Sequence, residues 1–503
     1  MNWKLISKII GVLLFIQTGL LLLCMGVGII YHEAQWPFAY TAAIAFLLGM
    51  FMQLLGRGAS TNMGRKDGYL VVTIAWVVYS LIGMLPYLFE NVTSGVASAF
   101  FETMSGYTTT GATIFDDIDA LPNSLLFHRS LSQWVGGVGI IFFTIALLPA
   151  FGVGEVRLFA AESTGLFHDK VHPRISVTAR WIGFVYCGIT LLSGVSYWLC
   201  GMSIFDAVNY ALTTTATGGF GTHTALMEEV YHSPLIEYVM AFFMMLSGIN
   251  YTLIYTSLLK GRIKRLWSDA ELRCYLRILT TITLACTLVL FLQHLRLSGN
   301  AAAPWWQSLE NAFRQAFFTT TALQTTTGYA TVDYTLWPIM LMPLLLFIMF
   351  AGACSGSSSS GFKCIRWSII YRVVANEVKH ILHPRAVLPV RINHTVIPTQ
   401  LIITTFAFAA LFAAAVFGGA FILTITGIQP DAAGPIFDYR DAITIALSQV
   451  ANIGPSMGYF GPLHSYEVLT PASKIVCSVL MLLGRLEIFP ILLICSRNFW
   501  KRS

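Results

Sequence analysis

A series of apolar runs, each about 20 residues long, constrains this chain more than any other feature, because that is the length a bilayer-crossing helix needs. Only 11% of the 503 residues are charged and 56% are hydrophobic, whereas soluble domains carry about 25% charge. This composition excludes a soluble enzyme, a disordered chain and a nucleic-acid-binding protein. We predict ten crossings, near 9–30, 36–56, 69–89, 129–149, 181–200, 235–259, 275–295, 336–371, 396–426 and 471–496.

The basic residues indicate the orientation of the chain. With the N-terminus in the cytoplasm, 24 of the 30 Lys and Arg residues fall inside and five fall outside, as the positive-inside rule requires. Of the acidic residues, 16 fall outside and seven inside. A negative outer face would concentrate cations at an entrance. Alternatively, the outer loops are acidic only because they lack Lys and Arg. We therefore expect both termini in the cytoplasm.

A motif recurs in four of the predicted outer loops, which we call the four glycine loops. Each follows a short amphiphilic stretch that is too short to cross a bilayer and too apolar to be a free loop, so we expect four re-entrant half-helices. These stretches lie near 97–108, 204–215, 308–325 and 439–450. The loops read Ser105-Gly-Tyr-Thr-Thr-Thr-Gly111-Ala-Thr, Thr213-Thr-Thr-Ala-Thr-Gly218-Gly-Phe-Gly-Thr, Thr325-Thr-Thr-Gly328-Tyr-Ala-Thr and Val450-Ala-Asn-Ile-Gly454-Pro-Ser-Met-Gly.

The repeat predicts an all-α polytopic membrane protein in which four pseudo-symmetric helix–re-entrant loop–helix units surround one pore. Two further transmembrane helices precede the first unit. The expected divisions are 1–60 for the N-terminal pair and 61–155, 156–265, 266–375 and 376–503 for the four units.

Extended Thr-Gly backbone suits the coordination of a dehydrated cation. Stacked carbonyl oxygens replace the water shell of the ion, and glycine permits the backbone angles that aim them inward. The C-terminal ends of the half-helices carry partial negative charge, which favours a cation at the centre. Pro455 makes the fourth loop unlike the others, so the ring would be only pseudo-fourfold. The candidate potassium ligands are Thr109, Thr110, Gly111, Ala216, Thr217, Gly218, Thr326, Thr327, Gly328, Asn452, Ile453 and Gly454.

Two further features lie within predicted spans. The eighth span is interrupted by a segment that we call the Gly/Ser loop, residues 352–361, which either forms a static kink or has a role of its own. Its notable residues are Gly352, Ser355, Gly356, Ser357, Ser358, Ser359, Ser360 and Gly361. Arg485 is a charge in the middle of the last span, where charges usually face a cavity or a partner. An ion pair with Glu102 or Glu487, or contacts with loop carbonyls, would explain it structurally.

At these residues the chain resembles the TrkH/KtrB superfamily of potassium transporters, over nearly its whole length. Besides the four glycine loops, the similar stretches begin at Gln133, Ala160, Pro173 and Gly484, reading Gln-Trp-Val-Gly-Gly-Val-Gly-Ile, Ala-Ala-Glu-Ser-Thr-Gly, Pro-Arg-Ile and Gly-Arg-Leu-Glu-Ile-Phe. The two extra helices in 9–56 are also similar. The resemblance implies a potassium-selective pore in the bacterial cytoplasmic (inner) membrane.

The same resemblance implies several further properties. It implies a homodimer, and a cytosolic TrkA-like ring that binds nucleotide and controls opening. It implies that the Gly/Ser loop is a mobile gate below the third glycine loop, and that Arg485 is a positive barrier in the pore. In related plant proteins, serine at the first-loop glycine accompanies sodium preference, so the intact Gly111 favours potassium by analogy.

Two other classes of function compete with a gated passive pore, namely a coupled transporter and an intramembrane enzyme. A proton- or sodium-coupled potassium transporter should place ionisable residues at mid-membrane, and in the sequence only Arg485 and Glu487 clearly qualify. A poorly selective potassium/sodium pore also fits the unlike fourth loop. An enzyme is not expected, because no metal-ligand pair such as H-E-x-x-H lies on a span.

The expected ligands and partners follow from these features. Potassium is the transported ion, and we expect no organic cofactor in this chain. The basic segments 154–180, 260–277 and 363–395 would contact either lipid headgroups or the regulatory ring. We expect membrane lipids but no nucleic acid among the partners.

Overall fold

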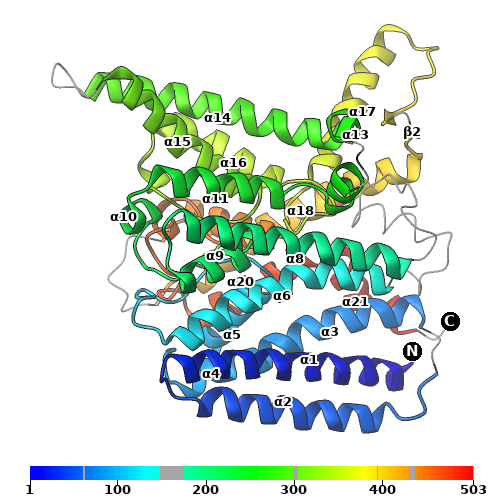
Figure 1. Cartoon of the computed structure of the whole chain (residues 1–503). Helices are drawn as coiled ribbons and strands as arrows, with labels where there is room; N and C mark the ends of the chain where they lie inside the picture. Colours follow the sequence, from blue (N-terminus) through cyan, green and yellow to red (C-terminus); the bar gives the residue numbers. More distant parts are fainter. Residues whose placement is uncertain are drawn as a thin grey trace.

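The computed structural model describes residues 1–60, 63–147, 175–259, 261, 263–297, 304–393, 395–429 and 437–501. In these ranges the chain is almost entirely helical and carries one two-stranded hairpin. The chain is a polytopic membrane protein, as predicted. Figure 1 shows long helices lying side by side, with both chain ends on the same side of the molecule.

Two helices precede the repeated part of the chain. Helices α1 (Trp3–Ile30) and α2 (Trp36–Leu55) pack closely along their lengths. A Cβ atom on Gly11 of α1 would approach the carbonyl oxygen of Gly49 of α2 to 2.9 Å, so small residues set the close helix spacing here. The predicted N-terminal extension is therefore a helical hairpin, and it lies at one edge of the molecule in Figure 1.

Four successive sets of helices follow, each with one of the four half-helices between two other helices. In the first set these are α3 (Arg65–Gly83) with α4 (Leu85–Phe89), then α5 (Val96–Tyr107), then α6 (Asn123–Leu147). The second set has α8 (Ile175–Leu199), α9 (Ile204–Ala216), α10 (Met227–Tyr231), α11 (Pro234–Ser247), α12 (Tyr251–Ile254), a π-helix (Tyr255–Leu259) and α13 (Ile263–Ser268). The division of the chain at exact residue boundaries stays a prediction.

The third and fourth sets repeat this order. The third has α14 (Ala270–Leu297), α15 (Trp305–Gln324), 3-10 turns at Tyr334–Leu336 and Ile339–Leu341, α16 (Met342–Ala351) and α17 (Cys364–Leu382). The fourth has strands β1 (Arg391–Ile392) and β2 (Thr395–Val396), then α18 (Thr399–Thr426), α19 (Tyr439–Ala451), a 3-10 turn (Gly458–Phe460), α20 (Pro471–Arg485), α21 (Phe489–Cys495) and α22 (Arg497–Trp500).

The four half-helices lie close to their predicted positions as α5, α9, α15 and α19. Two of them begin at side-chain caps, since Ser203 accepts a hydrogen bond from the Asp206 N–H and Asp438 accepts from Arg440 and Asp441. Helix α15 has 20 residues and is longer than predicted. Each half-helix gives way to a residue with positive φ, namely Thr109, Thr217, Thr326 and Asn452.

The count of spans differs from the ten predicted. Among the described residues, six helices are long and apolar enough to span a membrane, or eight if two bent pairs each count as one. The pairs are α11 with α12, bent by 96°, and α20 with α21, bent by 115°. The two remaining predicted spans are α6, whose polar residues such as Arg129 and Gln133 are buried inside the protein, and the run that the Gly/Ser loop divides into α16 and α17.

Candidate functional site

The four glycine loops meet in a closed ring. A Cβ atom on Gly111 would overlap the carbonyl oxygen of Gly218 in the next unit. The same relation joins Gly219 to Thr327 O, Gly328 to Ile453 O, and Gly454 back to Thr110 O. Because each glycine is in contact with a carbonyl of its neighbour and the fourth returns to the first, only glycine fits at these four positions.

The ring corrects the predicted register of the second loop by one residue. Positive φ angles recur at Thr109 and Gly111, and at the matching pairs of the other loops. In the second loop the matching pair is Thr217 and Gly219, so Gly219 and not Gly218 occupies the position of Gly111. Equivalent hydrogen bonds give the same register, at 2.9–3.0 Å: Thr110 N to Ser105 O, Gly218 N to Thr213 O, Thr327 N to Ala322 O and Ile453 N to Ser448 O.

The error has a simple physical origin. Thr217-Gly218-Gly219 offers two glycines, and matching by the Thr-Gly pair selects the first of them. The second loop is therefore Thr217–Gly219, and Ala216 is the last residue of α9. The other three predicted loops keep their register, and Gly218 takes the position that Thr110, Thr327 and Ile453 occupy elsewhere.

Gln133 of α6 explains why Gly218 lacks a side chain. Its Nε2 donates to Gly218 O at 2.7 Å, and its Oε1 accepts from Phe220 N at 3.1 Å. A Cβ atom on Gly218 would overlap the Gln133 amide. Gln133 was not among the predicted site residues, although a glutamine within a predicted span was the available signal.

Side-chain oxygens and amides fasten the loops to one another. Thr108 and Thr110 share a hydrogen bond of 2.8 Å, and Thr325 and Thr327 share one of 2.7 Å. Asn452 Nδ2 donates both to Thr110 Oγ1 and to Met481 O, each at 2.9 Å. The asparagine of the divergent fourth loop thus joins that loop to the first one.

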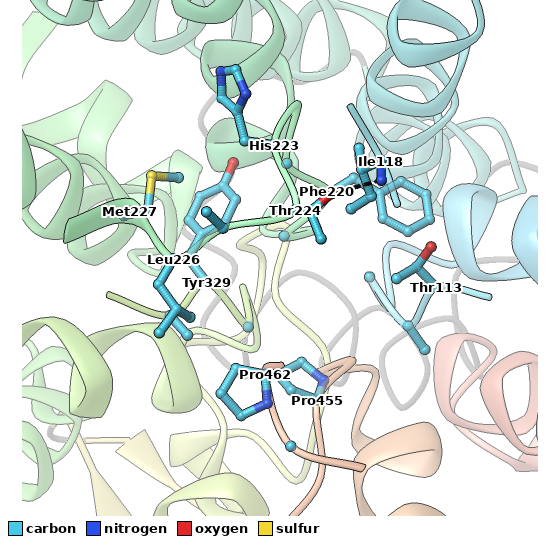
Figure 2. Close-up of a pocket in the computed structure, with 18 of the residues that line it drawn as sticks. Thr113, Ile118, Phe220, His223, Thr224, Leu226, Met227, Tyr329, Pro455 and Pro462 are labelled. Carbon is cyan, nitrogen blue, oxygen red and sulfur yellow. Dashed lines mark hydrogen bonds between the residues drawn. The ribbon is translucent and has the colours of Figure 1, made fainter. Parts of the chain in front are cut away.

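A cavity of about 120 Å³ adjoins the ring and is lined by all four units. Its lining residues follow the glycines in the chain, and Figure 2 shows Thr113, Phe220, Tyr329 and Pro455 approaching it from four different segments. This arrangement makes the cavity a vestibule on one side of the ring.

Arg129 of α6 supports the vestibule from inside the protein. Its Nε donates to Glu102 Oε1 at 2.9 Å, and both side chains are buried. Its other nitrogens donate to Gly221 O at 3.1 Å and to Thr113 Oγ1 at 3.2 Å. The Arg129 guanidinium therefore holds the segments after the first two glycine loops together. Glu102 is occupied here and is not the partner of Arg485.

The Gly/Ser loop lies on the other side of the ring, because it contacts residues that precede the glycines. Ser358 Oγ donates to Thr215 O at 2.8 Å, and Ser360 N donates to Thr326 Oγ1 at 3.0 Å. Both acceptors lie at the C-terminal ends of half-helices. The loop is buried throughout, with Gly356 half-buried, so it covers this end of the ring.

The break between α11 and α12 also holds the Gly/Ser loop. Tyr251 N donates to Gly356 O at 3.1 Å, and Cys354 N donates to Gly248 O at 3.0 Å. Irregular backbone at membrane depth needs such partners, because lipid offers none. The interruption that the sequence indicated is thus a folded segment, and several of its backbone groups have hydrogen-bond partners.

Arg485 contacts the Gly/Ser loop and not a carboxylate. Its Nη1 donates to Ser358 O and to Ser360 Oγ, each at 3.0 Å, and its Nη2 donates to Gly136 O at 2.8 Å. Of the structural partners considered for Arg485, the loop carbonyl is therefore the one present. Glu487 instead accepts from Arg366 at 2.7 Å, because helix α20 ends at Arg485 and the backbone turns before α21 begins.

More ionisable groups are buried than the sequence indicated. Glu237 contacts Arg314, and Lys474 contacts Glu467 at 2.7 Å. Lys363, expected among the cytoplasmic residues, is only 6% exposed. The sequence could not reveal this, because a polar residue at a span end points either to water or into the protein. The predicted docking segment 154–180 lies largely outside the described residues.

His223 is one of the residues that line the vestibule. It lies in the connection between α9 and α10, with Nδ1 2.7 Å from Asp119 Oδ1 and Nε2 3.5 Å from Asp206 Oδ1. Hydrogen bonding to Asp206, and then to Asp119, raises the pKa of His223 from 6.5 to about 9. The protonated His223 ring thus connects the segment that follows the second glycine loop to Asp119 of the first unit.

This raised pKa predicts a pH-dependent stability. A raised folded-state pKa stabilises the fold fully below pH 6.5, and the stabilisation is lost as pH rises through about 9. We expect the melting temperature of the purified protein to fall as the pH rises from about 7 to about 10. In His223→Gln, we expect the melting temperature to fall less over the same range. An identical pH profile for His223→Gln would contradict the assignment. Because the site is half-exposed, the effect will be modest.

Comparisons with known proteins agree with this architecture. A family model described as TrkH, cation transport protein, matches residues 37–502. The chain is 34% identical over 506 residues to the Trk system potassium uptake protein TrkH of Vibrio parahaemolyticus, and 32% identical over 505 residues to that of Escherichia coli K12. Each alignment covers 100% of both chains.

A solved structure gives the same result. The crystal structure of the potassium transporter TrkH from Vibrio parahaemolyticus matches with a TM-score of 0.87 and 32% identity, covering 100% of both chains. The sequence match, the shared fold and the ring of four glycine loops lead to one conclusion: this chain belongs to the TrkH family of cation transport proteins.

Proposed function

We propose that the chain takes up potassium across a bacterial cytoplasmic membrane through a selective pore lined by backbone carbonyls. The observation that carries this proposal is the closed ring, in which the glycine of each unit lies against a carbonyl of the next. The carbonyl oxygens of Thr110, Gly218, Thr327 and Ile453 would replace water around the ion. The relatives named for potassium uptake support potassium as the ion.

The electrostatic setting supports the same function. Four half-helices end at the ring, so four sets of terminal carbonyls place partial negative charge there. The Gly/Ser loop and Arg485 occupy the side of the ring away from the vestibule. A buried positive charge on a cation's path raises the energy of the ion, so these two elements form the closed gate in this proposal.

Other parts of the proposal rest on the family resemblance. We propose a homodimer in the inner membrane, with both termini in the cytoplasm and a cytosolic TrkA-like nucleotide-binding ring that controls the gate. Coupling to protons or sodium has less support, since Glu102, Glu237 and Glu487 each have an arginine partner. The buried Glu271 accepts a hydrogen bond from Ser355 N. Coupling through these carboxyl groups would require such contacts to break.

Ion flux into liposomes tests the function. We expect the purified chain to conduct potassium and rubidium well above sodium, with no proton gradient imposed, because the ring supplies its ligands from fixed backbone. Equal sodium flux would contradict selectivity. Transport that appears only with a proton or sodium gradient would favour the coupled transporter.

The corrected register gives a matched pair of variants. Gly219 has a φ of 82° and its Cβ would overlap Thr327 O, so Gly219→Ala should lower potassium flux by about tenfold or more, given the cost of such strain. Gly218→Ala meets the movable Gln133 side chain and should retain more flux. The reverse order of sensitivity, measured at equal amounts of folded protein, would contradict the register.

Removal of the Arg485 charge tests the gate. Arg485→Ala deletes three hydrogen bonds that hold the Gly/Ser loop and α6, so basal potassium flux should rise by about tenfold, equivalent to ~1.4 kcal/mol. The control is Arg440→Ala, since Arg440 is 94% exposed and should leave flux unchanged. Flux that falls or does not change in Arg485→Ala would count against a barrier at this position.

A further inference from the structure

A buried carboxylate contacts the start of the Gly/Ser loop. Glu271 lies in the first turn of α14 and is 6% exposed, and its Oε1 accepts a hydrogen bond from Ser355 N at 2.5 Å. Ser355 is fully buried. Because the Ser355 N–H is buried, losing this acceptor would leave it unpaired, which costs free energy. The loop is thus fastened to α14 by its own main chain.

The first turn of α14 is in turn held by the hairpin of β1 and β2. Asn393 lies at the turn of this hairpin, with a φ of 46°. Its Oδ1 accepts from Ala270 N at 2.8 Å, and its Nδ2 donates to Asp269 Oδ2 at 2.7 Å. Both ends of the Asn393 amide are therefore used to fix the residues next to Glu271.

The hairpin also packs on the helix that follows the Gly/Ser loop. Ile392 is fully buried in a cluster with Ile365 and Ile369 of α17. Asn376 of α17 donates to Leu388 O at 3.1 Å. Because α17 begins three residues after the loop, the hairpin reaches the loop from both ends: through Glu271 at Ser355 and through α17 at Cys364.

The position of the hairpin makes this connection accessible. Figure 1 shows β2 on the side of the molecule where both chain ends lie, next to α17. A displacement of the hairpin would shift the first turn of α14 through Asn393, and with it the acceptor of Ser355 N.

We propose that Glu271 is a positioning residue that fastens the Gly/Ser loop in its closed position, and that the β1–β2 hairpin is mechanically coupled to this contact. This inference rests on the proposed role of the Gly/Ser loop as the gate. Asn393 couples the hairpin to Glu271, so moving the hairpin moves the start of α14 and withdraws the acceptor from Ser355.

Basal potassium flux of the full-length purified chain in liposomes tests the proposal. Glu271→Ala should raise flux by about tenfold, because a buried Ser355 N–H left without an acceptor costs enough free energy to shift a two-state equilibrium by that factor. Asn393→Ala should raise flux in the same direction but less. Glu33→Ala is the matched control, since Glu33 also accepts from backbone N–H groups, those of Asn123 and Ser124, far from the loop.

The outcomes separate this proposal from the function on which it rests. If Arg485→Ala raises flux but Glu271→Ala does not, the gate stands and the tether is overturned. If neither raises flux, the gate itself fails. A lower melting temperature with unchanged flux would show a merely structural Glu271. Should Glu271→Ala not fold, the half-buried Asn393→Ala decides, and unchanged flux there overturns the proposal.

Discussion

The contact between a glycine of each unit and a carbonyl of the next is the constraint on which the rest of the structure depends. Gly111, Gly219, Gly328 and Gly454 lack the atom that would prevent four loops from meeting. These four glycines have left-handed backbone angles and come shortly after the ends of the half-helices. Helices α5, α9, α15 and α19 must therefore all end at the same depth. The surrounding helices can then be understood as support for that ring.

The support differs between the two sides of the ring. On the vestibule side, the buried Arg129–Glu102 pair and His223 hold the loop extensions together. On the other side, three units break their second helix: α11 from α12, α16 from α17, and α20 from α21. Ordinary straight helices would leave this end open, whereas the breaks place the Gly/Ser loop and Arg485 across it. One side of the ring is thus held by side-chain contacts between units, and the other is covered by the Gly/Ser loop and Arg485.

The sequence was sufficient for the architecture and for much of the site. Apolar runs predicted most of the membrane spans, and the repeated Thr-Gly motif predicted four half-helices close to their positions in the structure. It could not decide between Gly218 and Gly219, because both residues permit positive φ and only the position of Gln133 and the neighbouring unit separates them. Nor could it choose among the three candidate partners of Arg485, since Glu487 is two residues away in sequence but beyond a helix break.

Diffraction from crystals grown in rubidium would show directly whether the four glycine loops form one cation site. We expect an anomalous peak on the axis of the ring, coordinated by the carbonyl oxygens of Thr110, Gly218, Thr327 and Ile453. Well-ordered loops with no peak between them, or a peak only at sites away from the ring, would contradict it.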